Sequence, residues 1–351
     1  MKKFIIAAAT LLVAQLVLAA VTQWSGRTDM SATPESPFLA FEADKIDGLE
    51  ILGPDKERVV IDKKNGVWVL PALTNAPADS QMVTALIDKI AGLKEGFIVA
   101  NSQEAAHRFK VADNAFERHL LLKESDQVVG DFFVGTSPAF RQVHARKMGN
   151  FNIVAVGLST YELDTSADTW LDKGFLRVAD KDLTGMTFPD FSLYRTTGKE
   201  GKVANGWELA GSDNPSVDNK SAGELVAAVT GITISSVIDL PKSKDLSFAQ
   251  PDFSFTVTTT AQNTIQFAFV KIDETSFALK RSDKDLMATV GKATVERLQQ
   301  FTRSKIAGSQ PTAKPPVAVS NTTQAASSVP ATAGASATGA GPVTPPESTG
   351  D

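Results

Sequence analysis

The side chains that could catalyse a reaction or bind a metal are few in this sequence, and they follow no recognised pattern. There are three histidines, His107, His119 and His144, and no cysteine. No two histidines have the i, i+4 spacing that places a pair of metal ligands on one helix face, and no carboxylate motif accompanies them. The lack of cysteine excludes thiolate ligands, disulfides, cysteine nucleophiles and lipoprotein acylation. We therefore expect each histidine to have a structural role.

Paired acids offer the next candidates. Asp164 with Asp168, and Asp283 with Asp285, are close in sequence, and two carboxylates that flank a pocket can hydrolyse a glycosidic bond. Both pairs lie in polar stretches typical of solvated turns, and no calcium-binding loop pattern is present. No serine lies in a nucleophile-elbow motif. The clustered glycines fall in a hydrophilic connection between expected strands, where turns explain them: Gly198, Gly201 and Gly206.

These observations predict no catalytic, cofactor-binding or metal-binding residue, and they leave any ligand-binding residues unidentified. The formal net charge of −5 gives no reason to expect a nucleic-acid partner, because binding phosphates requires clustered lysine and arginine. With 351 residues, of which 42% are hydrophobic, the chain can build two domains with sizeable cores. We expect a protein that is not an enzyme and that binds no cofactor.

The N-terminal segment carries the clearest signal in the sequence. Lys2 and Lys3 precede an apolar run from Phe4 to Val21, whose 18 residues would span roughly 27 Å as a helix, close to the thickness of a bilayer core. The basic flank predicts that the N-terminus stays in the cytoplasm. An uncleaved anchor and a cleavable signal peptide, with Ala20 as the new N-terminus, both remain open. Either one places the body of the protein outside the cytoplasm.

Two further segments differ in composition from the body. Residues 23–40, after the anchor or signal segment 1–22, are polar with two prolines and predict a short tether. Residues 307–351 consist mainly of Pro, Ala, Thr, Ser, Gly and Val, with no aromatic residue, and predict a disordered tail. The tail is either a flexible solvated segment, or a spacer or sensor near the cell wall.

An internal repeat organises the chain between these ends. Residues of matching type recur at a constant offset of 139 positions over 26 residues, which is hard to obtain by chance. The pairs at this offset include Trp68 with Trp207, Asp79 with Asp218, Leu86 with Leu225 and Gly92 with Gly231. Small deletions then shift the pairing to Phe116 with Phe253, Phe133 with Phe269, Arg146 with Lys280 and Gly157 with Gly291.

Each copy predicts the same succession of elements. A strand opens it, a polar loop and a tryptophan-bearing strand follow, and an aspartate, Asp79 or Asp218, caps an amphipathic helix. Alternating apolar residues then predict antiparallel strands. In the first copy they are Leu120 and Leu122, Phe132–Val134, Val143 and Ala145, and Ile153–Val156; in the second they are Phe253, Phe255 and Val257, then Ile265, Phe267 and Phe269, then Phe277 and Leu279. The opening strands contain Leu49 and Ile51, or Phe191 and Leu193. The first helix stripe is Met82, Val83, Leu86, Ile87, Ile90 and Leu93. A helix over 292–303, with Val295, Leu298 and Phe301 inward, closes the body.

The predicted fold class is α+β. Two related modules, residues 41–175 and 176–306, each form an antiparallel sheet backed by one main amphipathic helix, after a single N-terminal membrane helix. Trp68 and Trp207 could stack on sugars if they were exposed. Their equal places in the repeat, each on a strand facing the amphipathic helix, favour core packing instead.

Several short segments of the sequence resemble the domain of unknown function 4340 family, and the resemblance covers about residues 41–305. They are Asn65–Leu70, Pro77–Asp79, Leu86–Leu93, Val143–Arg146, Trp170–Lys173 and Gly206–Leu209. The resemblance implies a membrane-anchored extracytoplasmic protein with no assigned enzymatic activity and no catalytic residues to carry over. Some members of the family accompany ABC-type transport systems, including those of gliding motility, as auxiliary components.

Three functions follow from these expectations. The first is a non-enzymatic, membrane-tethered accessory or scaffold protein of the bacterial envelope that contacts another envelope protein, such as a transporter component. The second is a binding protein for an envelope glycan or small ligand, and the third is an unrecognised hydrolase. We expect a single-pass inner-membrane protein with its body in the periplasm or other extracytoplasmic space. The alternative is a cleaved, free periplasmic protein.

N-terminal sequencing of the mature protein tests the anchor. We expect the sequence to begin near Met1, because the apolar run is long enough to span the bilayer. A mature chain beginning at Ala20 would show that the segment is a signal peptide.

Overall fold

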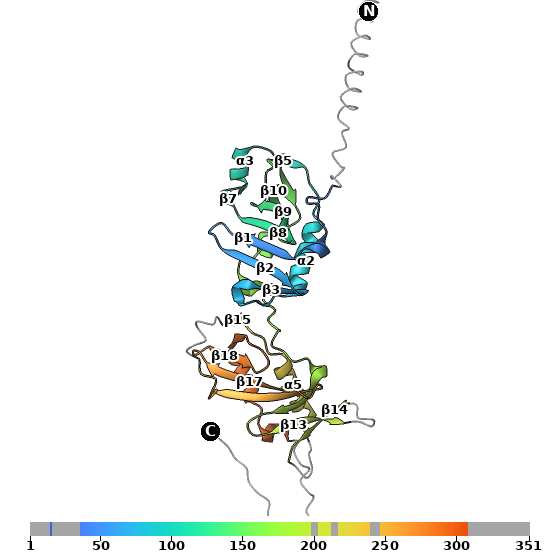
Figure 1. Cartoon of the computed structure of the whole chain (residues 1–351), viewed down its shortest axis with the longest axis vertical. Helices are drawn as coiled ribbons and strands as arrows, with labels where there is room; N and C mark the ends of the chain where they lie inside the picture. Colours follow the sequence, from blue (N-terminus) through green and yellow to red (C-terminus); the bar gives the residue numbers. More distant parts are fainter. Residues whose placement is uncertain (1–14, 16–35, 198–202, 212–216, 239–245, 308–351) are drawn as a thin grey trace, which may run out of the picture. The chain divides into compact units, whose positions relative to one another are not determined.

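The folded part of the chain is a mixture of large antiparallel sheets and few helices, as the sequence predicts (Figure 1). The computed structural model describes residues 36–197, 203–211, 217–238 and 246–307, together with Gln15. Among these residues, no helix has the length and apolar character needed to cross a membrane. Apart from Gln15, the predicted anchor lies outside the described residues, as does the predicted tail from residue 308 onward.

The first sheet has nine strands in the described part of the chain, in the order β4-β3-β2-β1-β8-β9-β10-β11-β5. Every neighbouring pair is antiparallel. The strands are β1 (Gly48–Leu52), β2 (Arg58–Lys64), β3 (Val67–Leu70), β4 (Ala76–Pro77), β5 (Ile98–Ala100), β8 (Arg118–Glu124), β9 (Gln127–Val134), β10 (Val143–Lys147) and β11 (Ile153–Val156). Helix α2 (Ser80–Ala91) contributes its apolar face to the core that these strands share.

Helix α2 begins where the sequence predicts and for the predicted reason. The Asp79 carboxylate accepts hydrogen bonds from the amides of Gln81 at 3.0 Å and Met82 at 3.1 Å, which lack partners inside the helix. The buried face consists of Val83, Leu86, Ile87 and Ile90. Met82, predicted to belong to this face, is instead 41% exposed.

The second sheet has eight described strands in the order β14-β13-β12-β16-β17-β18-β19-β15. They are β12 (Leu183–Thr187), β13 (Ser192–Thr197), β14 (Val203–Leu209), β15 (Ser236–Val237), β16 (Phe253–Thr259), β17 (Thr264–Lys271), β18 (Ser276–Arg281) and β19 (Met287–Gly291). Helix α5 (Asn219–Thr230) begins after Asp218, whose carboxylate accepts from the amide of Lys220. Strand by strand, this order matches the series from β3 to β5 in the first sheet.

The closing helix is shorter than predicted. The expected helix over 292–303 is two helices, α7 (Lys292–Gln299) and α8 (Arg303–Ile306), which are separated at residues 300–302. Val295, Leu298 and Phe301 are buried as expected.

Two strands, β2 and β12, lie where the sequence did not predict a strand. The predicted polar loop after the opening strand contains β2, whose Val59 and Ile61 are fully buried. In the second half, Leu193 lies in the second strand of its sheet, β13, and β12 precedes it. These strands are short and flanked by polar residues, so their apolar alternation is brief.

The strand register corrects two of the proposed repeat pairs. Because Arg146 corresponds to Lys280, Ala145 corresponds to Leu279. Val134 pairs with Ala145 and Phe269 pairs with Leu279, so Val134, not Phe133, is the residue equivalent to Phe269. Phe133 points to the opposite face, because a shift of one residue along a strand reverses the side chain. Phe116, proposed as the partner of Phe253, lies outside the sheet in β7 (Ala115–Phe116).

The body begins earlier than the predicted boundary at residue 41. Phe38 is 1% exposed, and its ring makes an edge contact with Phe132 at 5.4 Å. Its amide donates to the carbonyl of Leu93 at 2.8 Å. Residues 36–40, predicted as tether, therefore belong in part to the first core.

Substitution of Leu86 by aspartate tests the packing of α2. Leu86 is 6% exposed, so the new carboxylate would be buried without a partner and should lower the free energy of unfolding by on the order of 4 kcal/mol. Denaturant unfolding measures the free energy of unfolding of Leu86→Asp. The matched control is Ala85→Asp, because Ala85 lies at an exposed position of the same helix. Equal stability of the two variants would contradict the placement of the helix.

Candidate functional site

The richest group of polar side chains lies on the face of the first sheet that points away from α2. There His119 of β8, Phe133 of β9 and Arg146 of β10 lie side by side, since Phe133 is the register partner of both other residues. The His119 ring stacks on Phe133 with centroids 4.2 Å apart, and the Arg146 guanidinium lies 4.7 Å from the centroid of the same ring. A cation and an imidazole thus pack against one aromatic ring.

A small layer covers this row. It consists of helix α3 (Gln103–Arg108) and the hairpin of β6 (Val111–Ala112) and β7. The layer shares a second core with the sheet, separate from the core under α2: Ala105, Ala106, Val111, Ala112, Phe133 and Ile153. Gly135 permits the close approach, because a Cβ there would lie 2.0 Å from the Phe109 carbonyl oxygen.

Arg146 ties the layer to the sheet. Its side chain is buried, with Nε donating to the Val111 carbonyl at 2.6 Å and Nη1 to the Asn150 carbonyl at 2.9 Å. Nη2 donates to the carboxylate of Asp113, whose side chain is 69% exposed. A guanidinium has five N–H groups, and these contacts occupy most of them. Arg146 is therefore a structural anchor that retains little capacity for a ligand.

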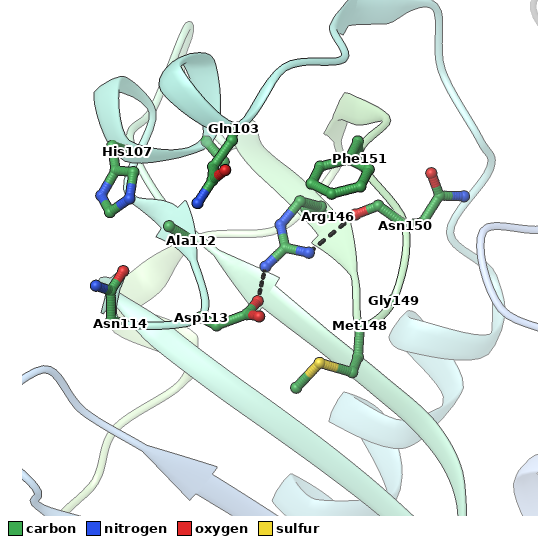
Figure 2. A pocket seen from close by; sticks show the side chains of 11 residues that line it. Gln103, His107, Ala112, Asp113, Asn114, Arg146, Met148, Gly149, Asn150 and Phe151 are labelled. Atoms are coloured by element: carbon green, nitrogen blue, oxygen red, sulfur yellow. Dashed lines mark hydrogen bonds and ion pairs between the residues drawn. The ribbon is translucent and has the colours of Figure 1, made fainter.

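A cavity of about 370 Å³ opens beside Arg146 (Figure 2). Gln103 and His107 approach it from α3, Asn114 from the hairpin turn, and Phe151 from the turn before β11. The polar groups contributed by Gln103, His107 and Asn114 can donate or accept hydrogen bonds, and Phe151 supplies a flat apolar surface. The arrangement can hold a small polar molecule, but it presents no nucleophile next to a base.

The three histidines all belong to this half of the chain but do not converge. His107 is exposed at the cavity, and His119 lies 2.7 Å from a carboxylate oxygen of Asp131 through Nε2. His144 is 6% exposed, with its Nδ1 2.9 Å from the Thr136 hydroxyl and its ring against Phe109. Burial lowers the pKa of His144, although its interaction with Thr136 opposes the shift, and so favours the neutral imidazole.

Of the four paired acids, Asp164, Asp283 and Asp285 lie in irregular or turn segments as predicted, whereas Asp168 lies in helix α4 (Ala167–Trp170). Asp283 receives two hydrogen bonds from Arg281, at 2.9 and 2.7 Å, which hold the pKa of Asp283 below its usual value against the effect of burial. Asp164 accepts from the amide of Ser166 and, through its carbonyl, from the indole of Trp170. In the described ranges, no three His, Asp or Glu side chains are grouped so that they could hold a metal ion.

The tryptophans of the repeat are buried. Trp68 is 4% exposed and Trp207 is 8% exposed, and both belong to the main core. Each has a cation from the neighbouring strand over its ring, Lys63 at 5.5 Å and Arg195 at 4.8 Å. Packing explains both residues, and no aromatic groove is built from them.

The family model described as domain of unknown function, DUF4340, matches residues 68–251, just over half of the chain. The chain belongs to the DUF4340 family. The matched segment begins at Trp68 in β3 and contains every residue that lines the cavity beside Arg146. No curated protein and no solved structure matches the chain. Within the DUF4340 match, sequence reasoning noticed Arg146 and the histidines but missed the covering layer, which has no clear periodicity.

Replacing Arg146 tests its anchoring role. Arg146→Met keeps much of the volume but leaves the Val111 and Asn150 carbonyls without their donor, which should cost about 3 kcal/mol of stability and speed amide exchange over residues 103–116. Asp113→Asn is the matched control and should cost less than about 1 kcal/mol, because Asp113 is exposed. Unchanged exchange in Arg146→Met would contradict the anchoring role.

Proposed function

We propose that this DUF4340 protein is a non-enzymatic, membrane-tethered accessory or scaffold protein of the bacterial envelope. Its N-terminal segment holds it in the inner membrane, and its body outside the cytoplasm contacts another envelope protein. The resemblance of its sequence to the family points to an ABC-type transport system as the partner class. The body consists of two related modules derived from one repeated unit, the first ending near residue 175 and the second spanning 176–306.

One observation carries the proposal: the buried polar side chains of the described residues are bound to the protein's own structure. They are Glu50, His144, Arg146, Ser159, Ser221 and Arg281. Arg281, for example, donates to the Leu176 carbonyl at 2.7 Å and pairs with Asp283. An enzyme needs reactive groups held in place but available to a substrate. In the described residues, the buried polar side chains already bond to other groups of the protein.

Glu50 is another buried polar side chain whose partners belong to the protein itself. It is 7% exposed and lies between Arg58, at 2.6 Å, and Lys123, at 3.4 Å. Burial alone would raise its pKa, but the hydrogen bonds and charges of Arg58 and Lys123 hold it below the usual value. The carboxylate therefore stays ionised as part of a structural network across β1, β2 and β8.

The outward face of the second sheet supports a docking role. Tyr194 of β13 is 47% exposed, and it lies in one row with Gly185 and Thr258. A Cβ on Gly185 would lie 3.1 Å from the Tyr194 ring, so the glycine leaves room for that ring. A tyrosine among short hydroxyl side chains gives a flat amphipathic surface with little conformational entropy to lose on binding.

The cavity beside Arg146 favours a second candidate function, the binding of an envelope glycan or small polar ligand. Its amide and imidazole groups, with the exposed ring of Phe151, have the composition that a sugar requires. The cavity belongs to the first module, so this function does not need the second sheet.

Photo-crosslinking in native membranes tests the scaffold function. The full chain with a photoreactive residue at Tyr194 should yield a reproducible adduct with another envelope protein, because that side chain lies on the open sheet face. The same substitution at Tyr161, which is 70% exposed in the first half, is the matched control. Recovery of only the unmodified monomer from both variants would contradict the scaffold function and favour ligand binding.

A further inference from the structure

Large apolar side chains are exposed together at one edge of the first sheet. Among the described residues, the edge strand β5 pairs with β11 alone and is the last strand in the sheet order. It lies beside α3 at one end of the first half (Figure 1). Phe97, Ile98 and Val99 are consecutive and are 56%, 55% and 47% exposed. Phe151, in the turn that leads into β11, is 58% exposed. Successive side chains of an extended strand point to opposite faces, so Ile98 and Val99 make this edge apolar on both sides. An exposed apolar edge marks an interaction site.

The fold itself does not require this surface. The strand at the equivalent place in the second sheet is β15, which also pairs with the last long strand of its sheet. Its residues are Ser236, which is half-buried, and Val237, which is 8% exposed. The same edge can thus be built without exposed aromatic or large aliphatic residues, so those of β5 need another explanation.

The chain enters the first half beside this edge. Pro37 forms a bridge with Lys94, and the amide of Glu95 donates to the Ser36 carbonyl at 3.0 Å. The next residues, through Gly96, lead directly into the exposed strand. Residues 22–35 connect this point to the apolar N-terminal run, and a chain of that length spans at most about 50 Å when fully extended.

We propose that the Phe97–Val99 edge docks on the lipid bilayer in which the N-terminal segment is anchored. This inference rests on the membrane tether of the proposed function. A short tether keeps the edge at a high effective concentration near the lipid surface, so a patch of a few apolar side chains suffices for binding. Lys94, exposed three residues before Phe97, adds attraction to anionic headgroups.

The geometry favours lipid over a partner strand. β5 has three residues, and its pairing with β11 shifts register between Ile153 and Val154. A short, irregular edge offers few backbone hydrogen bonds to an added strand, and natural sheets use such edges to discourage pairing. Open sheet edges do not enter the hydrocarbon core. The apolar side chains therefore reach only the boundary of headgroups and acyl chains, roughly 5–10 Å deep.

The absence of cysteine in the sequence permits a direct test. The full chain with Ile98→Cys, labelled with an environment-sensitive fluorophore, is reconstituted into phosphatidylcholine–phosphatidylglycerol vesicles that carry nitroxide lipids. The matched control is Ile272→Cys, at a 43% exposed isoleucine between β17 and β18. We expect the label at Ile98 to emit at shorter wavelength and to be quenched by the nitroxide, and the label at Ile272 to behave as it does in buffer.

The outcomes separate the inference from the proposed function. A chain that floats with the vesicles but shows equal, unquenched emission at both positions would overturn lipid docking and leave the tether intact. A chain that does not float would overturn the tether, and the docking inference with it. Shielding of the label at Ile98 only in native membranes, with a protein crosslinked there, would show that a protein covers the edge and would overturn the inference.

Discussion

The hydrogen bond between a helix-capping aspartate and the far end of its own half of the chain holds each half together. The amide of Asp79 donates to the Trp170 carbonyl at 2.7 Å, and the amide of Asp218 donates to the Ile306 carbonyl at 2.9 Å. In each half the aspartate side chain also caps the helix that packs into the sheet core. The segment that ends each half therefore bonds to the residue that starts its helix, which closes each half into one unit.

In each sheet, the face that points away from this helix is covered, or left open, by other means. In the first half, α3 and the β6–β7 hairpin cover part of that face and need Arg146 to hold them. In the second half, Tyr194 and threonine side chains remain accessible. In the first half, Arg146 joins two layers, and His119 and His144 are already held by Asp131 and Thr136.

The sequence predicted best the features whose cause is local. The aspartate caps and the stripe of α2 follow from contacts within one or two helical turns. Alternating apolar residues located β8 to β11 and β16 to β18, but not β19. The order of strands and the covering layer depend on contacts between residues far apart in the sequence, such as Arg146 with Val111 across 35 residues, which leave no periodic trace. The pairing of Phe133 with Phe269 failed for another reason: residue type agreed, but one step of register reverses the face of a strand.

A duplicated fold offers its own control for assigning function. Features present in both halves, such as the capped helix and the cation over a buried tryptophan, are explained by folding, because both sheets need them. Features present in only one half are not required by the fold that the two halves share, so they need another explanation. The Arg146 cavity and the apolar β5 edge belong only to the first half, while the open face around Tyr194 belongs to the second. The first half is also the one nearer in sequence to the apolar N-terminal run.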